Sequence, residues 1–179
     1  FMNSMQSVTL QRGAGSSAFG TAAFAGSLNF ESIPLATTRD FLEVQLTAGS
    51  WGTRRASVEK ATGMHSGFAA YGRVSAQETE GYRRHSGNRA QSAFGSVGWF
   101  GARDAVKFTG FAGRSRMQLA YYAPSEAELR VDPRANPMSP LERDAFHQEM
   151  ASLQWSRRLT DRTSVTTTAY RNGAGGNFD

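Results

Sequence analysis

The chain has 179 residues and a mass of 19.4 kDa, a size typical of one ordinary domain with its own core. Cysteine is absent, which excludes disulfides and thiol chemistry, and 19 glycines with a hydrophobic fraction of only 39% favour strands and turns over a helical bundle. No uncharged apolar run approaches the roughly 18 residues of a membrane-spanning helix. The net charge is +5, but the basic residues occur singly or in pairs and accompany no nucleic-acid motif, so we expect no nucleic-acid partner.

Residues 8–30, VTLQRGAGSSAFGTAAFAGSLNF, contain two apolar stretches around a core of Gly, Ala and Ser. Side chains this small do not pack into a core of their own, and glycines allow the tight turns of a chain that threads along another surface. The spacing of Gly13, Gly15 and Gly20 differs from that of a dinucleotide or P-loop fingerprint, and no Lys-Ser or Lys-Thr pair follows. The segment is therefore not predicted to bind a phosphate.

From residue 41 onwards the sequence is dominated by alternation with a period of two, which predicts strands with one apolar face. In the first of these runs, Leu42, Val44 and Leu46 alternate with polar residues. Turn residues such as Gly and Asp separate the runs, as in successive hairpins. The predicted strands cover residues 41–49, 54–63, 68–77, 92–101, 105–113, 147–159 and 164–172.

The predicted connections differ in length. Residues 78–91 and 115–144 are expected to form long loops, the second because it holds most of the prolines. The turns at 101–104 and 160–162 are short, and residues 175–179 look like the opening of a further loop. Short turns at one end and long loops at the other are typical of outer-membrane barrels.

Tryptophans support this geometry, because Trp99 and Phe100 precede one short turn and Trp155 precedes another. Such a rim is typical of the aromatic girdle at a membrane interface. A β-sandwich, in which the tryptophans would be core residues, remains open on pattern alone, since strand signals are weak for both folds.

Chemical sites are poorly supported. His65, His85 and His147 lie far apart without metal-ligand spacing, and we expect polar turn or lumen roles for them. The acids around Glu128 lie among prolines and suit a solvated loop. No Gly-x-Ser-x-Gly nucleophile motif occurs. The sequence therefore predicts no enzyme, no metal site and no cofactor.

The order of segments resembles TonB-dependent outer-membrane receptors. Residues 8–30 are similar to the end of the plug domain, with its arginine-glycine pair, small-residue loop and closing Gly-x-x-Asn strand, and residues 41–63 to the first barrel hairpin. The stretch 75–87 resembles the third strand entering the second outer loop. Residues 108–126 and 136–160 resemble the fifth strand, third outer loop and sixth strand of iron-siderophore members.

The resemblance implies active uptake of ferric siderophores or a similar scarce nutrient across the bacterial outer membrane, energised by TonB through a segment outside this chain. The implied fold is the end of a plug in residues 1–36 and a partial transmembrane antiparallel barrel in 37–179. Such barrels need about 22 strands, and about seven fit after Pro34. With no secretory leader at the start, we expect a fragment. The implied plug motif is Arg12, Gly13, Gly15, Gly20, Gly26 and Asn29, with Arg12 held by acids of the barrel interior.

Ligand contacts are expected from outer loops, where aromatic faces and arginines suit planar, anionic chelates. The candidates are Trp51, Tyr82, Arg83, Arg84, Tyr121 and Tyr122. The same residues would serve equally well as anchors at the membrane interface or as parts of loops that face lipopolysaccharide. Outer-membrane lipid and lipopolysaccharide are therefore expected partners. Two alternatives remain open: a small outer-membrane barrel with an adhesin or structural role, and a soluble β-sandwich that binds polyanions.

Overall fold

The computed structural model describes residues 5–12 and 26–178 of the chain. Within them, nine strands and one short helix follow one another in sequence. Their bounds are β1 Met5–Arg12, β2 Gly26–Ser32, β3 Asp40–Ala48, β4 Arg54–Thr62, β5 Phe68–Thr79, β6 Asn88–Phe100, β7 Asp104–Gln118, α1 Glu126–Val131, β8 Arg143–Thr160 and β9 Thr163–Phe178. The described part is therefore almost entirely β, as the alternation predicts.

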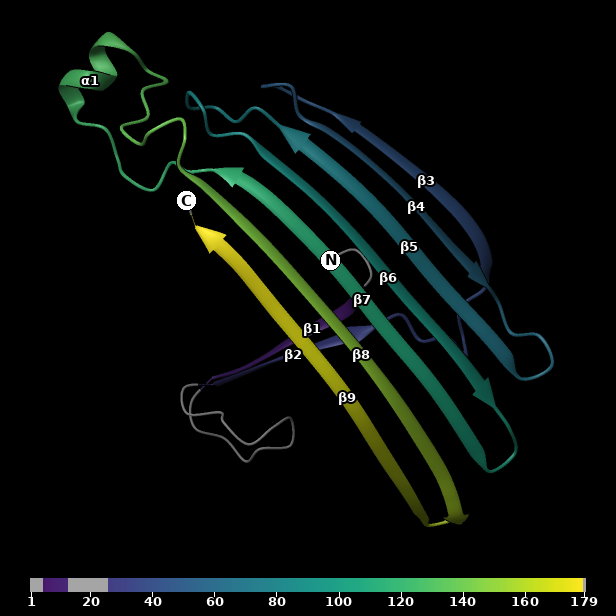
Figure 1. The fold of residues 1–179 in the computed structure, drawn as a ribbon. Helices are drawn as coiled ribbons and strands as arrows, with labels where there is room; N and C mark the ends of the chain where they lie inside the picture. The colour runs from purple at the N-terminus through teal and green to yellow at the C-terminus, as the bar shows by residue number, and fades with distance from the viewer. Residues whose placement is uncertain (1–4, 13–25, 179) are drawn as a thin grey trace.

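Strands β3 to β9 form one antiparallel sheet in which every strand pairs with its neighbours in sequence, and β1 and β2 form a separate two-stranded sheet (Figure 1). This order needs only hairpin connections. Connections 49–53, 80–87 and 119–142 leave one end of the large sheet, the loop rim, and Figure 1 shows α1 beyond that end. The remaining connections leave the other end, the turn rim. The prediction of about seven strands after Pro34, with short turns at one end, is confirmed.

Four strands, β5 to β8, extend into regions predicted to be loops, and β6 and β7 do so furthest. β6 begins at Asn88, inside the expected loop 78–91, and β7 runs to Gln118, inside the expected loop 115–144. The predicted loop bounds are therefore wrong at these ends. Gln118 still has a ladder partner, Arg143, so backbone pairing continues where the apolar alternation has stopped.

The last strand is also longer than predicted. β9 reaches Phe178, which lies opposite Asp144, so the prediction of a loop opening at residue 175 is wrong. Glycine-rich sequence weakens the strand signal because it offers few side chains to pack. The long neighbouring strand β8 nevertheless supplies hydrogen-bond partners up to this point.

Strand register assigns the side chains of the large sheet to two faces, because residues opposite each other in an antiparallel pair point the same way. Val58, Val74 and Ala93 lie opposite one another across β4, β5 and β6. Arg73 and Phe94 form the adjacent row and point to the other face. The face that carries Arg73 is called the inner face below, and the face that carries Val74 the outer face.

The hydrophobic core lies on the inner face, where the chain that follows β2 packs against the sheet. Leu35 is only 3% exposed, and Lys107 donates a hydrogen bond from Nζ to Ser32 Oγ at 3.0 Å. These contacts fix the segment between the two sheets to the wall formed by β4–β7. The core cluster around Leu35 contains Ala61, Ala69, Tyr71 and Phe94, with Ile33, Phe41, Phe100 and Phe111 partly buried against it.

A buried polar network lies next to this core. Arg73 Nη1 lies 3.9 Å from Glu59 Oε1, and these side chains are only 7% and 15% exposed. Arg73 Nη2 also donates to Ser57 Oγ at 3.2 Å, and Tyr71 Oη donates to the second carboxylate oxygen of Glu59. Buried charges are tolerated only when paired and hydrogen-bonded, so these contacts hold β4 and β5 in one arrangement.

The outer face carries a continuous apolar band that crosses all seven strands. Many of its members are largely exposed, including Leu46 at 78% and Leu42 at 65%. A contiguous apolar surface with this much exposure indicates contact with another apolar surface, such as a membrane or another protein. The band comprises Leu42, Val44, Leu46, Ala56, Val58, Phe68, Ala70, Val74, Ala76, Ala93, Val97, Trp99, Val106, Phe108, Ala112, Ala151, Leu153, Trp155, Val165 and Ala169.

Candidate functional site

The predicted ligand-contact residues lie at the loop rim, in three connections that contact one another. The backbone N–H of Glu80 donates to the carbonyl of Trp51 at 2.9 Å, which joins the first connection to the second. The N–H of Arg84 donates to the carbonyl of Arg134 at 2.8 Å, which joins the second to the third. The loop rim is therefore one assembly and not three independent loops.

Trp51 is held in an uncommon backbone conformation. Its φ is 60° and that of Gly52 is 63°, as required of the two central residues in a type I′ turn. The N–H of Thr53 closes this turn by donating to the Ser50 carbonyl at 3.2 Å. A bulky residue at positive φ costs about 1–3 kcal/mol, and the contacts of the surrounding loops must offset this strain.

An aromatic pair and a cation meet at this turn. The rings of Trp51 and Tyr82 lie edge to face with centroids 5.1 Å apart, and the Arg134 guanidinium carbon lies 4.7 Å from the centre of the indole ring. Arg134 Nε also donates to the Tyr82 carbonyl at 2.6 Å. Trp51 and Tyr82 remain 43% and 49% exposed. Together they present apolar ring surface and positive charge to the solvent.

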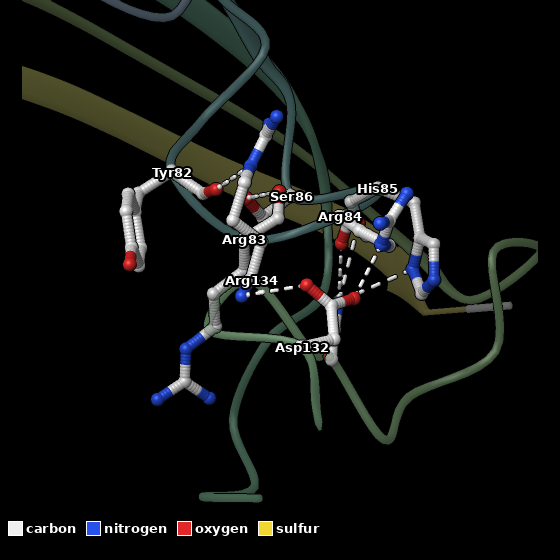
Figure 2. A network of polar contacts seen from close by, with 8 residues as sticks. Tyr82, Arg83, Arg84, His85, Ser86, Asp132 and Arg134 are labelled. Carbon is white, nitrogen blue, oxygen red and sulfur yellow. Dashed lines mark hydrogen bonds and ion pairs between the residues drawn. The ribbon is translucent and has the colours of Figure 1, made fainter. Parts of the chain in front are cut away.

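An ion pair joins the second and third connections (Figure 2). The Arg84 guanidinium donates to Asp132 Oδ2, and the other carboxylate oxygen accepts from the N–H of Arg134 at 2.9 Å. In Figure 2 the Arg84 side chain points toward Asp132, whereas the Arg134 guanidinium points away from it. Arg84 therefore already has an internal partner, and its part in ligand contact stays a prediction.

Asn136 joins the same connections through its side-chain amide. Its Nδ2 donates to the carbonyls of Arg84 at 3.0 Å and Leu119 at 2.8 Å, and its Oδ1 accepts from the N–H of Met138 at 3.1 Å. One amide thus satisfies backbone groups from two connections, which makes it a positioning residue for the whole assembly.

Arg83 reaches the third connection at the start of the segment that leads to α1. Arg83 Nη1 donates to the carbonyl of Tyr122 at 2.9 Å, so it contacts the backbone of this residue. Tyr121 and Tyr122 are each 67% exposed. The structure brings Trp51, Tyr82, Arg83 and Arg84 into one network, which the backbone of Tyr122 joins.

Helix α1 was not predicted, although its start is marked in the sequence. Ser125 is the N-cap: its hydroxyl oxygen accepts a hydrogen bond from the Glu128 N–H, the Glu128 carboxylate accepts one from the Ser125 N–H, and the pair forms a capping box. The Ser125 hydroxyl and the Ser125 N–H both donate hydrogen bonds to the Glu128 carboxylate, and these bonds lower the pKa of Glu128. A Ser-x-x-Glu pattern after a proline was therefore the available signal for this helix.

Asp132, Arg134 and Asn136 were not predicted to belong to the site. Asp132 and Asn136 each precede a proline, a pattern that marks a turn but not its partners. Their contacts reach the connection 80–87, far away in sequence, so no local pattern reveals them. Only the hairpin order, which returns the chain to the loop rim twice, brings these segments together.

The loop rim should open at acid pH. Hydrogen bonds from Arg84 and from the N–H of Arg134 hold the pKa of Asp132 below its ordinary value, so the ionised form is stabilised in the assembled loops. This contribution is complete above the unfolded pKa of about 3.9 and is lost as pH falls through the lower folded pKa. The protection of the Arg84 and Arg134 backbone amides against hydrogen exchange should therefore be constant from about pH 5 to 8 and should decrease when the pH is lowered below about 4.

Two variants sharpen this test. Asp132→Asn should lower the protection at neutral pH and remove most of its pH dependence. Asp161→Asn, in the turn between β8 and β9 at the turn rim, is the matched control and should change neither. Full protection of the Arg84 amide in Asp132→Asn at neutral pH would contradict the assignment.

Gly81 controls the shape of the connection that carries Tyr82. Its φ is 77°, and a Cβ added there would lie 2.5 Å from the Ser86 carbonyl oxygen. Gly81→Ala is therefore expected to destabilise the loop by about 1–3 kcal/mol and to speed tryptic cleavage after Arg84. Gly95→Ala is the matched control, because a Cβ there meets nothing within 4 Å. Equal cleavage rates in the two variants would count against this explanation.

The predicted interface aromatics divide between the two faces. Trp99 and Trp155 both lie opposite Val106, so they share the outer face near the turn rim, and each is 39% exposed. Phe100 points inward and packs against the core around Leu35. Neighbouring residues of a strand alternate between faces, so a girdle containing both Trp99 and Phe100 is not what the structure forms.

Only part of the predicted plug motif lies within the described residues. Arg12 ends β1 opposite Gly26, and Asn29 lies opposite Thr9 in β2. Gly13, Gly15 and Gly20 lie outside the described residues. The arginine and the closing Gly-x-x-Asn strand thus form the two sides of one antiparallel pair.

Within 5–12 and 26–178, His, Asp and Glu form no group of three placed to hold a metal ion. No helix of the described chain has the length and apolar composition needed to cross a membrane.

No protein-family model matches the sequence, and no curated protein matches it. Solved structures do. The ferric-catecholate import receptor Fiu from E. coli K12, in its open form, superposes with a TM-score of 0.80 at 16% identity, covering 96% of this chain and 29% of that one. The siderophore receptor PiuA from Acinetobacter baumannii superposes with a TM-score of 0.80 at 16% identity, and the match covers 99% of this chain and 27% of that one. The chain therefore has the fold of one segment of these receptors and spans less than a third of their length.

Proposed function

We propose that this chain is the end of the plug and the first seven barrel strands of a TonB-dependent outer-membrane receptor for ferric siderophores, with residues 1–36 in the plug and 37–179 in the barrel. The observation that carries the proposal is the sheet β3–β9, in which consecutive antiparallel strands present an apolar outer band and bind the segment around Leu35 on their inner face. The likeness to Fiu and PiuA over nearly the whole chain supports it.

In this role the protein binds and moves its substrate and makes or breaks no bond. The apolar band faces lipid, and pairing of every strand with its neighbours in a closed barrel satisfies the backbone groups inside the bilayer. The inner face carries the polar network of Arg73 and Glu59 beside the plug segment. Energy from TonB enters through plug residues outside this chain, and Arg12 is proposed to lock the plug to acids of the barrel interior.

The loop rim is the proposed first contact for the ferric complex. Trp51 and Tyr82 offer partly exposed ring surface, and Arg134 adds a positive charge beside them. Flat, anionic catecholate-type chelates suit such a surface, because rings stack on them and cations balance their charge. Arg83, Tyr121 and Tyr122 extend it toward α1. The named substrate of Fiu belongs to this chemical class.

Uptake of radioactive iron tests this function. The complete reading frame that contains this chain is expressed in bacteria lacking their own siderophore receptors, and ferric catecholates and hydroxamates are supplied in turn. We expect uptake of at least one complex, abolished when TonB is deleted. Absence of uptake for every complex, from a receptor shown to reach the outer membrane, would overturn the proposal.

The ligand contacts are tested with two variants of the same receptor. Trp51→Ala combined with Tyr82→Ala should raise the half-saturating concentration about tenfold, from loss of stacking and cation–π contacts. Tyr121→Ala with Tyr122→Ala tests the second pair in the same way. Val131→Ala is the control: the Val131 side chain lies on α1 and is 88% exposed, so the substitution should leave uptake unchanged.

A further inference from the structure

The two sheets are joined in the chain by residues 33–39, called the linker, which lie between the end of β2 and the start of β3. Within the described residues, no ladder of backbone hydrogen bonds connects β1–β2 to β3–β9. In Figure 1 the small sheet runs across the strands of the large one. The place of the small sheet therefore depends on the linker and on side-chain contacts.

The linker is fixed to the wall formed by the large sheet. Leu35 is 3% exposed, and its Cδ1 atom lies so near β6 that a Cβ added at Gly98 would be 3.2 Å from it. The carbonyl of Pro34 accepts hydrogen bonds from the N–H groups of Thr37 and Thr38 at 3.2 and 3.1 Å, which closes the linker into a turn. None of these contacts involves β1 or β2, so the linker stays on the wall if the small sheet moves.

Lys107 holds the end of β2 by a different kind of contact. It lies on the inner face of β7, opposite Gly98, and its Nζ donates to Ser32 Oγ at 3.0 Å. In the part of the chain that the structure describes, no carboxylate lies within ion-pair distance of Lys107. When such a hydrogen bond breaks, water replaces both partners, so its net contribution is much smaller than its strength in isolation. The contact with Ser32 can therefore open and close reversibly.

The contact of Leu35 has no such replacement. Withdrawing this side chain from the core cluster would expose apolar surface of Leu35, Tyr71 and Phe94 to water. Ser32 and Leu35 are three residues apart and meet neighbouring points of the wall on β7 and β6. One of these contacts is polar and reversible, and the other is apolar and persistent. The boundary between a movable and a fixed part of the chain therefore falls between them.

We propose that Lys107 is a latch for transport, which must release Ser32 so that the β1–β2 sheet can leave the wall while the linker stays attached through Leu35. The inference rests on the proposed function, because only energised transport requires the small sheet to move. Lys107 lies near the turn rim, at the opposite end of the sheet from Trp51 and Tyr82. The latch therefore controls movement of the plug and not capture of the ligand.

Reversible cross-linking of the complete receptor tests this inference. This chain contains no cysteine, so Ser32→Cys and Lys107→Cys can be joined by a bifunctional thiol reagent with a cleavable spacer as long as the lost lysine side chain. The link should leave siderophore binding unchanged and lower uptake about tenfold or more, because a conformational step is blocked. Cleavage of the spacer should restore uptake. The matched control joins Leu35→Cys to Ala69→Cys, two members of the core cluster, and should leave uptake nearly unchanged.

A second set of variants measures the latch without a cross-link. Lys107→Met keeps an unbranched side chain but removes the ammonium group, and Gln154→Met, opposite Lys107 on β8, is the control. Lys107→Met should raise the maximal rate of uptake about threefold at an unchanged half-saturating concentration, because only the conformational step becomes easier. Adding Ser32→Ala should change nothing further if Lys107 acts through Ser32. Equal maximal rates in the two Met variants would contradict a latch.

The outcomes separate this inference from the proposed function. Uptake that continues with the Ser32–Lys107 link closed would overturn the latch, as would an equal loss of uptake with the Leu35–Ala69 link. Correct folding of each variant is verified beforehand by heat-modifiable migration in gels. A receptor whose unlinked form imports iron, but equally well when linked, contradicts only the latch. A receptor that imports no complex in any form contradicts the proposed function and the latch with it.

Discussion

Replacing Arg73 by alanine is expected to lower the free energy of unfolding of the complete protein by about 3–5 kcal/mol. Arg73 and Glu59 are nearly buried on the inner face and lie 3.9 Å apart. Removing the guanidinium takes the counter-charge away from the carboxylate of Glu59, which keeps the hydrogen bond from the Tyr71 hydroxyl. An uncompensated buried charge is costly because water cannot reach it.

Denaturant unfolding of the receptor in detergent measures this effect. Arg54→Ala is the matched control: it removes the same side chain from a pair that is largely exposed, 4.0 Å from Glu78. Exposed pairs contribute at most about 1 kcal/mol, so the control should be nearly neutral. Equal losses in the two variants would show that the Arg73 network does not hold β4 and β5 together.

Leu35→Ala is expected to cost about 2–5 kcal/mol, the usual range for a large-to-small change in a well-packed core. Leu35 is 3% exposed and contacts the inner face through the cluster that includes Tyr71 and Phe94. It is the residue by which the chain leaving β2 is anchored to the barrel wall. Its loss should therefore loosen that connection before the sheet itself unfolds.

Two readouts separate these effects. Denaturant unfolding reports the total loss of stability, and the rate of tryptic cleavage after the exposed Arg39 reports local opening of the anchored segment. Leu141→Ala is the control, because Leu141 lies in the connection to β8 and is 77% exposed. It should change neither the stability nor the cleavage rate by much. Unchanged cleavage after Arg39 in Leu35→Ala would contradict an anchoring role.

The strands and their facing could be predicted from sequence because alternation directly reports which side chains share a face. Leu42, Val44 and Leu46 were predicted to share one apolar face, and the register confirms this. Strand ends could not be predicted in the same way. Beyond the apolar band both faces become polar, as at Arg114 and Ser115, so the pattern stops while the hydrogen-bond ladder continues.

The site was predicted in part. Trp51, Tyr82 and Arg84 stand out locally as aromatic and basic residues in turns, and the structure brings them together. Asp132 and Arg134, which hold them, act through contacts between distant segments and leave no local signal. Phe100 was assigned with Trp99 because both precede a turn, although alternation alone separates their faces.

The central claim is that the outer face of β3–β9 meets membrane lipid while the inner face does not. This chain contains no cysteine, so single cysteines can be introduced cleanly within it at Val74 and Val97 on the outer face and at Ser75 and Ser96 on the inner face. Spin labels at these positions are compared in the complete receptor in bilayers. We predict that Val74 and Val97 labels are relaxed by membrane-dissolved oxygen and shielded from a water-soluble nickel chelate, and that the Ser75 and Ser96 labels are not relaxed by oxygen. Equal oxygen relaxation on both faces, or chelate access to the outer face, would contradict the account.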